Sequence, residues 1–97
     1  MTVTVQDHRA ESRYEARVGS ELAGIADYRL GDGVITFVHT EVPPEFSGQG
    51  IAQALARHAL DDARERGLSV IPRCSYIRSF IDKNPEYGDL VSSLERR

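Results

Sequence analysis

The sequence predicts an α/β domain with the element order ββββαβα, built on a mostly antiparallel sheet. Over residues 3–42, apolar and polar residues alternate in short runs separated by turn residues, which is typical of strands with one buried face. After residue 50 the apolar residues recur every three or four positions, which is the period of a helix packed on one side. A short apolar run at residues 68–71 then returns to the sheet. Because a strand, a helix and a returning strand form a crossover, we expect the fourth and fifth strands to lie parallel and the long helix to pack on the sheet.

The first four strands are separated by clear turn signals. Gly31-Asp32-Gly33 predicts a tight hairpin, because Asp-Gly accepts the positive φ angles that such turns need. Pro43 and Pro44 end the fourth strand, because proline has no N–H to donate to a neighbouring strand. The expected strands cover residues 3–7, 13–18, 22–30 and 34–42.

The second half of the chain predicts two helices around the fifth strand. The long helix begins at Ile51, carries one apolar stripe and ends at Gly67, where glycine suits a left-handed C-terminal cap. The fifth strand, residues 68–71, is stopped by Pro72. Residues 75–83 have helical spacing, Asn84-Pro85 breaks that helix, and residues 86–94 are expected to form a final short one.

Composition limits the classes of function. A chain of 97 residues is long enough for one domain, which we place at residues 1–97. The 12 basic and 15 acidic side chains give a net charge of -3, without the basic field that sequence-independent nucleic-acid binding needs. One cysteine cannot form an internal disulfide, and no run approaches the roughly 20 apolar residues of a membrane span. We therefore expect a cytoplasmic protein that binds neither nucleic acid nor membrane.

The segment between the fourth strand and the long helix carries the most informative motif. Gly48 and Gly50 stand directly before the N-terminus of the helix. The first N–H groups of a helix have no partner within it, and together with the helix dipole they form an anion site that small residues leave open to a pyrophosphate. The alternative is that the two glycines only make the turn from strand to helix. A Gly-x-Gly pattern alone leaves both interpretations open.

This segment resembles motif A of the GNAT superfamily of acetyl-CoA-dependent N-acetyltransferases. In that motif a Gln/Arg-x-x-Gly-x-Gly/Ala loop binds the pyrophosphate of coenzyme A. The serine at the first position of the loop replaces the usual Gln or Arg, which removes one long polar side chain and leaves the backbone donors in place. The residues that the resemblance assigns to the coenzyme A pyrophosphate are Ser47, Gly48, Gln49, Gly50, Ile51 and Ala52.

A closer resemblance is to the minimal, single-domain GNAT-like proteins, which lack most of the N-terminal helices of larger acetyltransferases. Their four motifs occur here in order over about half of the chain: His39-Thr40-Glu41-Val42, Gly48-Gln49-Gly50, Pro72-Arg73-Cys74-Ser75-Tyr76 and Asn84-Pro85-Glu86-Tyr87. The resemblance implies acetyl-CoA as co-substrate, a small amine or peptide amine as acceptor, no metal, and a monomer or weak homodimer. It also implies that the fourth and fifth strands splay apart and that the pantetheine arm bonds to the backbone of Thr40 and Val42.

His39 and Cys74 are the candidate catalytic residues. His39 lies late in the fourth strand and Cys74 follows the fifth, so the topology is expected to bring both to one crevice. A neutral imidazole takes up a proton near neutral pH and can serve as the base for the acceptor amine, although a strand histidine can also simply bond to the backbone. Cys74 is open to three interpretations: a small buried residue, an acid for the leaving thiol, or a nucleophile that carries the acetyl group.

Other polar and aromatic residues have weaker functional interpretations. Asn84 suits equally a hydrogen bond to the pantetheine amide and a cap at the Pro85 turn. Tyr76 and Tyr87 are interpreted as core residues. His58 and the pair Asp61-Asp62 lie on the long helix without the spacing of a metal site or a carboxylate dyad, so they are expected at the surface.

The function that these observations predict is an N-acetyltransferase that moves an acetyl group from acetyl-CoA to an amine. The alternative is a coenzyme A-binding or protein-interaction module without turnover. The acceptor is not identified by the sequence, because scattered carboxylates such as Glu41, Glu45 and Glu86 are as typical of a solvated surface as of a site for a cation.

Overall fold

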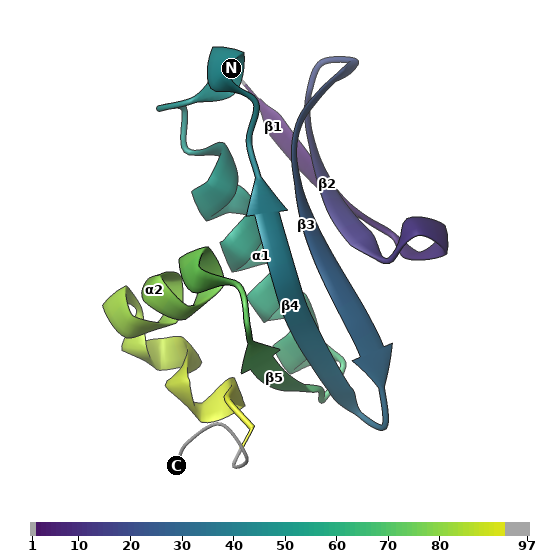
Figure 1. Ribbon diagram of the computed structural model, residues 1–97, viewed down its shortest axis with the longest axis vertical. Coiled ribbons are helices and arrows are strands. Elements are labelled where there is room, and N and C mark those ends of the chain that lie inside the picture. Colours follow the sequence, from purple (N-terminus) through teal and green to yellow (C-terminus); the bar gives the residue numbers. More distant parts are fainter. Residues whose placement is uncertain (1, 93–97) are drawn as a thin grey trace.

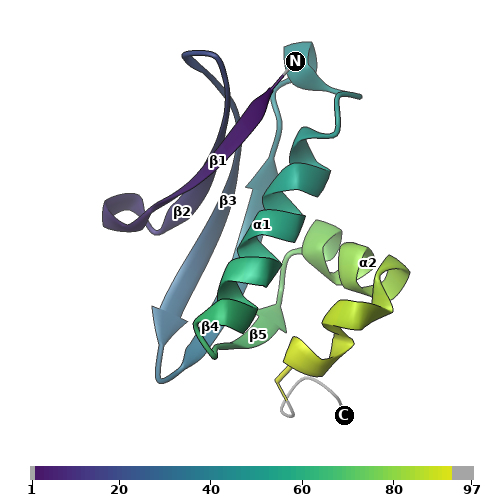
Figure 2. The ribbon, with the colours of Figure 1, turned by 180° about the vertical axis from the view of Figure 1, so that it is seen from behind.

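A five-stranded sheet with helices on one face forms the framework of the protein (Figures 1 and 2). The structure is a computed structural model and describes residues 2–92. The strands follow one another across the sheet in chain order, and only β4 and β5 pair in parallel. The strands are β1 (Val3–His8), β2 (Arg13–Val18), β3 (Glu21–Gly31), β4 (Val34–Glu41) and β5 (Ser69–Pro72). The helices are α1 (Ile51–Glu65) and α2 (Ser75–Lys83), with short 3-10 helices η1 (Arg9–Glu11), η2 (Pro44–Phe46) and η3 (Pro85–Leu90). The predicted element order and the parallel pair are confirmed.

The end of the chain differs from the prediction. In place of a helix over residues 86–94, the 3-10 helix η3 begins at Pro85 and ends at Leu90. The chain then turns back to the sheet, where Val91 bridges Val70 and the Ser92 N–H donates to the Val70 carbonyl at 2.8 Å. This tertiary pairing ends the helix before it can extend. Residues 93–94 of the expected helix lie outside the described residues.

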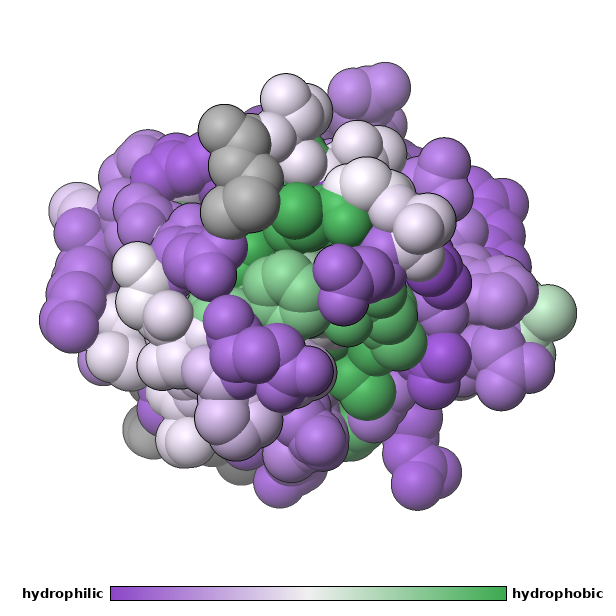
Figure 3. Space-filling model, turned by 90° about the horizontal axis from the view of Figure 1, so that it is seen from above, coloured by the Kyte–Doolittle hydropathy of each residue, from purple (hydrophilic) through white to green (hydrophobic). Residues whose placement is uncertain are grey.

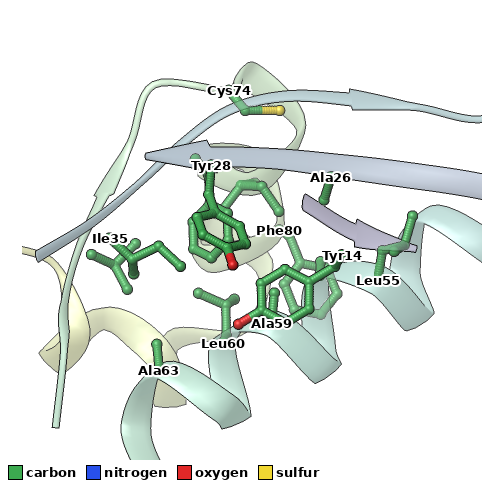
Figure 4. Close-up of a cluster of buried hydrophobic side chains, with 14 of the residues drawn as sticks. Tyr14, Ala26, Tyr28, Ile35, Leu55, Ala59, Leu60, Ala63, Cys74 and Phe80 are labelled. Carbon is green, nitrogen blue, oxygen red and sulfur yellow. The ribbon is translucent and has the colours of Figure 1, made fainter. Parts of the chain in front are cut away.

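The core lies between α1 and one face of the sheet, with α2 closing its β5 side (Figure 4). The sheet contributes Tyr14, Ala16, Ala26 and Phe37, all almost fully buried. The buried face of α1 carries the predicted apolar stripe, consisting of Ile51, Leu55, Ala56, Ala59, Leu60 and Ala63. Neither α1 nor any other helix in the described part of the chain is long and apolar enough to cross a membrane.

Two tyrosines and Arg66 connect the first three strands with the C-terminal end of α1. The Tyr14 hydroxyl donates to Asp62 Oδ2 at 2.6 Å, and the Tyr28 hydroxyl donates to Asp7 Oδ1 at 2.6 Å. Arg66 Nη1 lies 3.3 Å from the carboxylate of Asp62 and 3.4 Å from that of Asp7, and so links the two pairs. Burial raises the pKa of Tyr28 to about 12, and burial also raises the pKa of Tyr14. Asp62, expected at the solvated surface, therefore accepts a hydrogen bond from the core.

The opposite face of the sheet carries no helix in the described chain, yet it holds a buried carboxylate. The Glu15 side chain is 8% exposed, because His8, Arg13 and Arg17 surround it. Its oxygens lie 3.0 Å from His8 Nδ1, 2.9 Å from Arg13 Nε and 3.2 Å from Arg17 Nη2. The hydrogen bond with His8, with further contributions from the two arginines, lowers the pKa of Glu15 to about 2.

Replacing Glu15 should therefore make the free energy of unfolding depend less on pH in the acid range. A group whose folded pKa is depressed stabilises the protein fully above its unfolded pKa and loses this effect as the pH falls toward the folded value. We expect Glu15→Gln to lower the free energy of unfolding by about 1 to 3 kcal/mol at pH 7, the range for hydrogen bonds to charged groups. The difference from the unmodified protein should shrink between the ordinary pKa of 4.5 and pH 2. Urea unfolding across that range measures it, and the exposed Glu21→Gln is the control; a difference constant with pH contradicts the assignment.

Candidate functional site

A bulge in β4 separates the two halves of the strand. In the pairing of β3 with β4, Asp27 lies opposite His39 and Tyr28 lies opposite Phe37, so Val38 is an extra residue without a partner. The extra residue shifts the alternation of side chains. Phe37 is buried on the α1 face, Val38 and His39 are both exposed, and Thr40 returns to the α1 face in the cross-strand row of Tyr14 and Ala26.

The parallel pairing of β4 and β5 ends directly before this bulge. The register runs from Val34 opposite Ser69 to Phe37 opposite Pro72, and the Cys74 N–H donates a last hydrogen bond to the Phe37 carbonyl at 2.8 Å. In the described chain, β4 then continues to Glu41 without a β5 partner. Ligands of open α/β sheets bind beyond the carboxyl ends of the strands, and this is where β4 and β5 separate.

A cavity of about 300 Å³ lies between the end of β4, the glycine loop and the start of α2. Six of the nine residues predicted to bind coenzyme A line it: Val42, Ser47, Gly48, Gly50, Ile51 and Ala52. Phe46, Gln53 and Tyr76 complete its walls. The cavity combines an apolar floor with the polar groups of a loop, which is the usual composition of a small-molecule site.

The loop presents backbone rather than side chains to the cavity. Gly48 and Gly50 adopt φ angles of +79° and +76°, and a Cβ built on either residue meets no atom within 4 Å. Gly50 is the N-cap of α1 and supplies no side-chain hydrogen bond, so the first N–H groups of the helix are left for another acceptor. With the positive end of the helix dipole, this arrangement suits an anionic group such as a phosphate.

Three residues predicted to bind coenzyme A do not line the cavity. Gln49 Nε2 donates to the Glu45 carbonyl at 3.3 Å, which ties the loop to η2. Asn84 Nδ2 donates to the Phe80 carbonyl at 2.8 Å, so its side chain caps the end of α2. The Thr40 hydroxyl lies 3.3 Å from Cys74 Sγ.

Thr40 and Cys74 make a side-chain contact just beyond the last paired residues of β4 and β5. Cys74 is the N-cap of α2 and is 7% exposed. Its carbonyl accepts from the Arg78 N–H at 3.0 Å, so the helix fixes the backbone that carries the thiol. A hydroxyl beside a thiol can either donate to the sulfur or accept from it. The pair therefore holds the sulfur against the unpaired end of β4.

His39 lies on the other face of β4. Its side chain is 56% exposed, and Nε2 lies 3.1 Å from Glu41 Oε1. The expectation that His39 and Cys74 share one crevice is not met, because the bulge leaves His39 on the face without helices and Thr40 on the face of Cys74. The two candidate catalytic residues flank the end of β4 from opposite sides.

Tyr76 is a site residue that sequence reasoning assigned to the core. Its ring packs on Phe80, with centroids 6.4 Å apart, and also forms part of the cavity wall. Burial raises the pKa of its phenol. The signal for this position in the sequence was the motif Pro72-Arg73-Cys74-Ser75-Tyr76, in which Tyr76 follows Cys74 by two residues. Tyr87 is a core residue as predicted: it is 4% exposed and its hydroxyl donates to Asp61 at 2.7 Å.

Residues 2–92 contain no cluster of side chains suited to binding a metal ion. No group of three or more His, Cys, Asp and Glu side chains in that range is arranged to hold a metal ion.

The start of α1 is held against the sheet by a close approach at Gly24 of β3. A Cβ at this position would lie 2.9 Å from Ile51 Cγ2, 3.1 Å from Leu55 Cδ1 and 3.2 Å from the Glu41 carbonyl oxygen. Glycine is therefore required where the first turn of α1 crosses β3 and β4. This contact fixes the helix N-terminus, and with it the glycine loop, relative to the end of β4.

Comparisons with known proteins identify relatives over most of the chain. The profile of the family described as GCN5-related N-acetyl-transferase matches residues 13–90. Protein NATD1 of Mus musculus is 31% identical over 97% of this chain and 84% of its own length. Protein NATD1 of Bos taurus is 41% identical over 69% of this chain, a match that spans 56% of the bovine protein. The solution structure of a GCN5-like protein from Staphylococcus aureus has a TM-score of 0.70 and 26% identity, covering 97% of this chain and 92% of that one.

Adding one methyl group at Gly24 should disturb the site through α1. We expect Gly24→Ala to lower the free energy of unfolding by about 1 to 3 kcal/mol, the usual cost of overpacking. Gly31→Ala, on the same strand, is the matched control: its Cβ meets nothing within 4 Å, and a change within about 0.5 kcal/mol is expected. Urea unfolding compares the two variants, and equal stabilities would show that α1 does not press on Gly24.

Proposed function

Because the chain belongs to the family of GCN5-related N-acetyl-transferases, we propose that it transfers an acetyl group from acetyl-CoA to a primary amine. The observation that carries this proposal is the cavity of about 300 Å³ at the N-terminus of α1, directly beyond the point where β4 loses its parallel partner. A glycine loop, a helix N-terminus and an unpaired strand end are three features that a long, phosphate-bearing thioester can use together.

The residues of the cavity fit such a donor. Backbone N–H groups of the loop and of the first turn of α1 bind the pyrophosphate, since Gly48 and Gly50 line the cavity without a side chain. The peptide groups of β4 beyond Phe37 bind the amide-bearing arm as an added strand would. Val42, Phe46 and Tyr76 exclude water from the apolar part of the arm. Ser47 stands where motif A of the GNAT superfamily usually has Gln or Arg, so binding here depends mostly on the backbone.

His39 is proposed to remove the proton from the acceptor. The amine nitrogen forms the new bond to the acetyl carbonyl carbon, the carbon–sulfur bond breaks, and the proton of the amine passes to the imidazole directly or through a water molecule. Glu41, 3.1 Å from Nε2, orients the ring and stabilises it once it is protonated. The exposure of His39 leaves it open to an acceptor arriving on the face without helices.

Cys74 is proposed to act on the sulfur side of the same reaction. In one role its S–H, held by Thr40, gives a proton to the departing thiolate of coenzyme A and regains one from water. In the other, its thiolate takes the acetyl group from the thioester, releases coenzyme A, and passes the acetyl group to the amine. The burial of the thiol favours the first role, since a nucleophilic thiolate needs an electropositive and accessible setting.

Coenzyme A binding should depend on Gly50. A valine there adds a β-branched side chain to a residue that lines the cavity and is strained at a φ of +76°, so Gly50→Val should abolish measurable binding in titration calorimetry. Gly33→Val is the matched control, because Gly33 has a φ of +75° in the β3–β4 hairpin and also has nothing within 4 Å. Both variants should lose stability, but only Gly50→Val should lose coenzyme A. Unchanged affinity in Gly50→Val would remove the glycine loop from the site.

The chemical step should depend on His39 and, less strongly, on Cys74. His39→Ala should leave the affinity for coenzyme A intact and lower kcat by on the order of 10² to 10⁴, the range that general-base catalysis supplies. Cys74→Ala should retain part of the activity if the thiol only protonates the leaving group. A dead Cys74→Ala, together with an acetylated Cys74 on intact-mass analysis, would establish the nucleophilic role.

The same assays separate an enzyme from a module without turnover. An enzyme releases free coenzyme A thiol from acetyl-CoA only in proportion to the acetylated amine. A protein that binds acetyl-CoA tightly and releases no thiol with any amine is a coenzyme A-binding module, and the proposed transfer is then wrong.

A further inference from the structure

A second hollow lies on the face of the sheet that carries no helix. It has a volume of about 90 Å³ and is lined by Leu22, Gly24, Ile25, Glu41 and Pro43. It shares no residue with the lining of the glycine-loop cavity. At the end of the molecule where β4 ends, Figure 3 shows an apolar area set among hydrophilic side chains.

The strand register places the side chains of this hollow on the face of His39. Glu15 of β2 lies opposite Ile25 of β3, which lies opposite Glu41 of β4, so these three share one face. Leu22 lies opposite Arg17, whose guanidinium reaches Glu15 on that same face. Glu41 therefore forms one wall of the hollow and also contacts His39 at 3.1 Å.

The hollow is apolar except for this carboxylate. Leu22 is 38% exposed, although a leucine of a two-layer fold is usually covered, and Ile25 and Pro43 are half-buried beside it. A volume of about 90 Å³ is far below the ~300 to 1,000 Å³ of ordinary ligand pockets, which suits a short aliphatic group.

Both signs of charge surround the hollow: Glu41 lines it, and Arg17 and Arg13 of β2 lie directly opposite Leu22 and Asp27. Arg13 and Arg17, the nearest arginines on β2, are both bonded to Glu15. Asp27, the cross-strand neighbour of His39, is half-buried and has no side-chain hydrogen bond or ion pair in the described chain. The next cation on β3, Arg29, lies four residues beyond Ile25. Glu41 and Asp27 thus favour a cation between the hollow and His39.

We propose that this hollow is the acceptor subsite and that the acceptor is a primary amine with a short aliphatic substituent. The inference rests on the proposed acetyl transfer and adds the chemical class of the acceptor. The aliphatic group occupies the hollow over Leu22 and Ile25, and the ammonium is attracted to Glu41. His39 takes one proton from the nitrogen, which then bonds to the acetyl carbon at the end of β4 while coenzyme A leaves as the thiol.

Two amines and one pair of variants test the subsite. Isobutylamine fills the hollow and methylamine does not, so the unmodified protein should have a lower KM for isobutylamine. Leu22→Ser should raise the ratio of the KM for isobutylamine to that for methylamine by roughly tenfold, the discrimination that an apolar pocket gives. Leu30→Ser is the matched control, since Leu30 is a 47% exposed leucine on the same strand and outside the hollow. A ratio that stays constant in Leu22→Ser, with methylamine still acetylated, overturns the subsite and leaves the acetyl transfer intact.

Binding of the amine can be measured by NMR even if no amine is acetylated. Isobutylamine added to the unmodified protein should shift the amide NMR signals of Leu22, Ile25 and Glu41 to saturation, and isobutanol, its uncharged analogue, should do so at least several-fold more weakly. Glu41→Gln should reduce the difference between the two compounds, and Glu65→Gln, an exposed residue of α1, should not. Equal binding of amine and alcohol, or no shift at these residues, contradicts an amine subsite whatever the outcome of the acetyl-transfer assay.

Discussion

The separation of β4 from β5 is the constraint on which the rest of the site depends. The parallel ladder stops at Phe37 and Pro72, and β4 continues to Glu41 with its peptide groups unpaired on that side. The residues of this strand end are exposed or half-buried, so its free peptide groups are accessible to a ligand. The bulge at Val38 lies at the same point. The side chains of β4 therefore change face directly after the residue at which its pairing with β5 ends. A ligand that supplies amide groups can complete the interrupted sheet.

The position of the glycine loop relative to this strand end is set by how α1 packs. Gly24 admits the first turn of α1 close to the sheet, and the hydrogen bond from Tyr14 to Asp62 anchors its last turns. A helix held at both ends keeps its N-terminal N–H groups directed at one place, which is what a phosphate site requires. The packing of α1 at both of its ends therefore determines the geometry of the cavity.

The residues proposed to act on the donor and those proposed to act on the acceptor lie on opposite faces of the sheet. Cys74 and Thr40 lie on the α1 face with the glycine-loop cavity, and His39 and Glu41 lie on the face without helices with the smaller hollow. Donor and acceptor can then approach the end of β4 from opposite sides. The open face is kept polar beside the hollow by the buried Glu15 and its partners His8, Arg13 and Arg17, which cover the sheet where a second helical layer is absent in the described chain.

The sequence by itself determined the element order, the parallel pair and the glycine loop, because each depends on local signals: alternation in the strands, helical spacing after Gly50, and prolines at the strand ends. It also placed six of the cavity residues, since a loop followed by a helix start is contiguous in the chain. Only the tertiary structure decided which face each side chain of β4 occupies. One extra residue in the pairing with β3 separates His39 from Cys74, and no pattern within β4 marks that residue as unpaired. The side chain of Asn84, which the sequence left open between two roles, bonds to Phe80. The role of Asp62 was decided by Tyr14, 48 residues away, and that of Tyr76 by cavity residues 23 to 34 residues away, separations at which local periodicity carries no information.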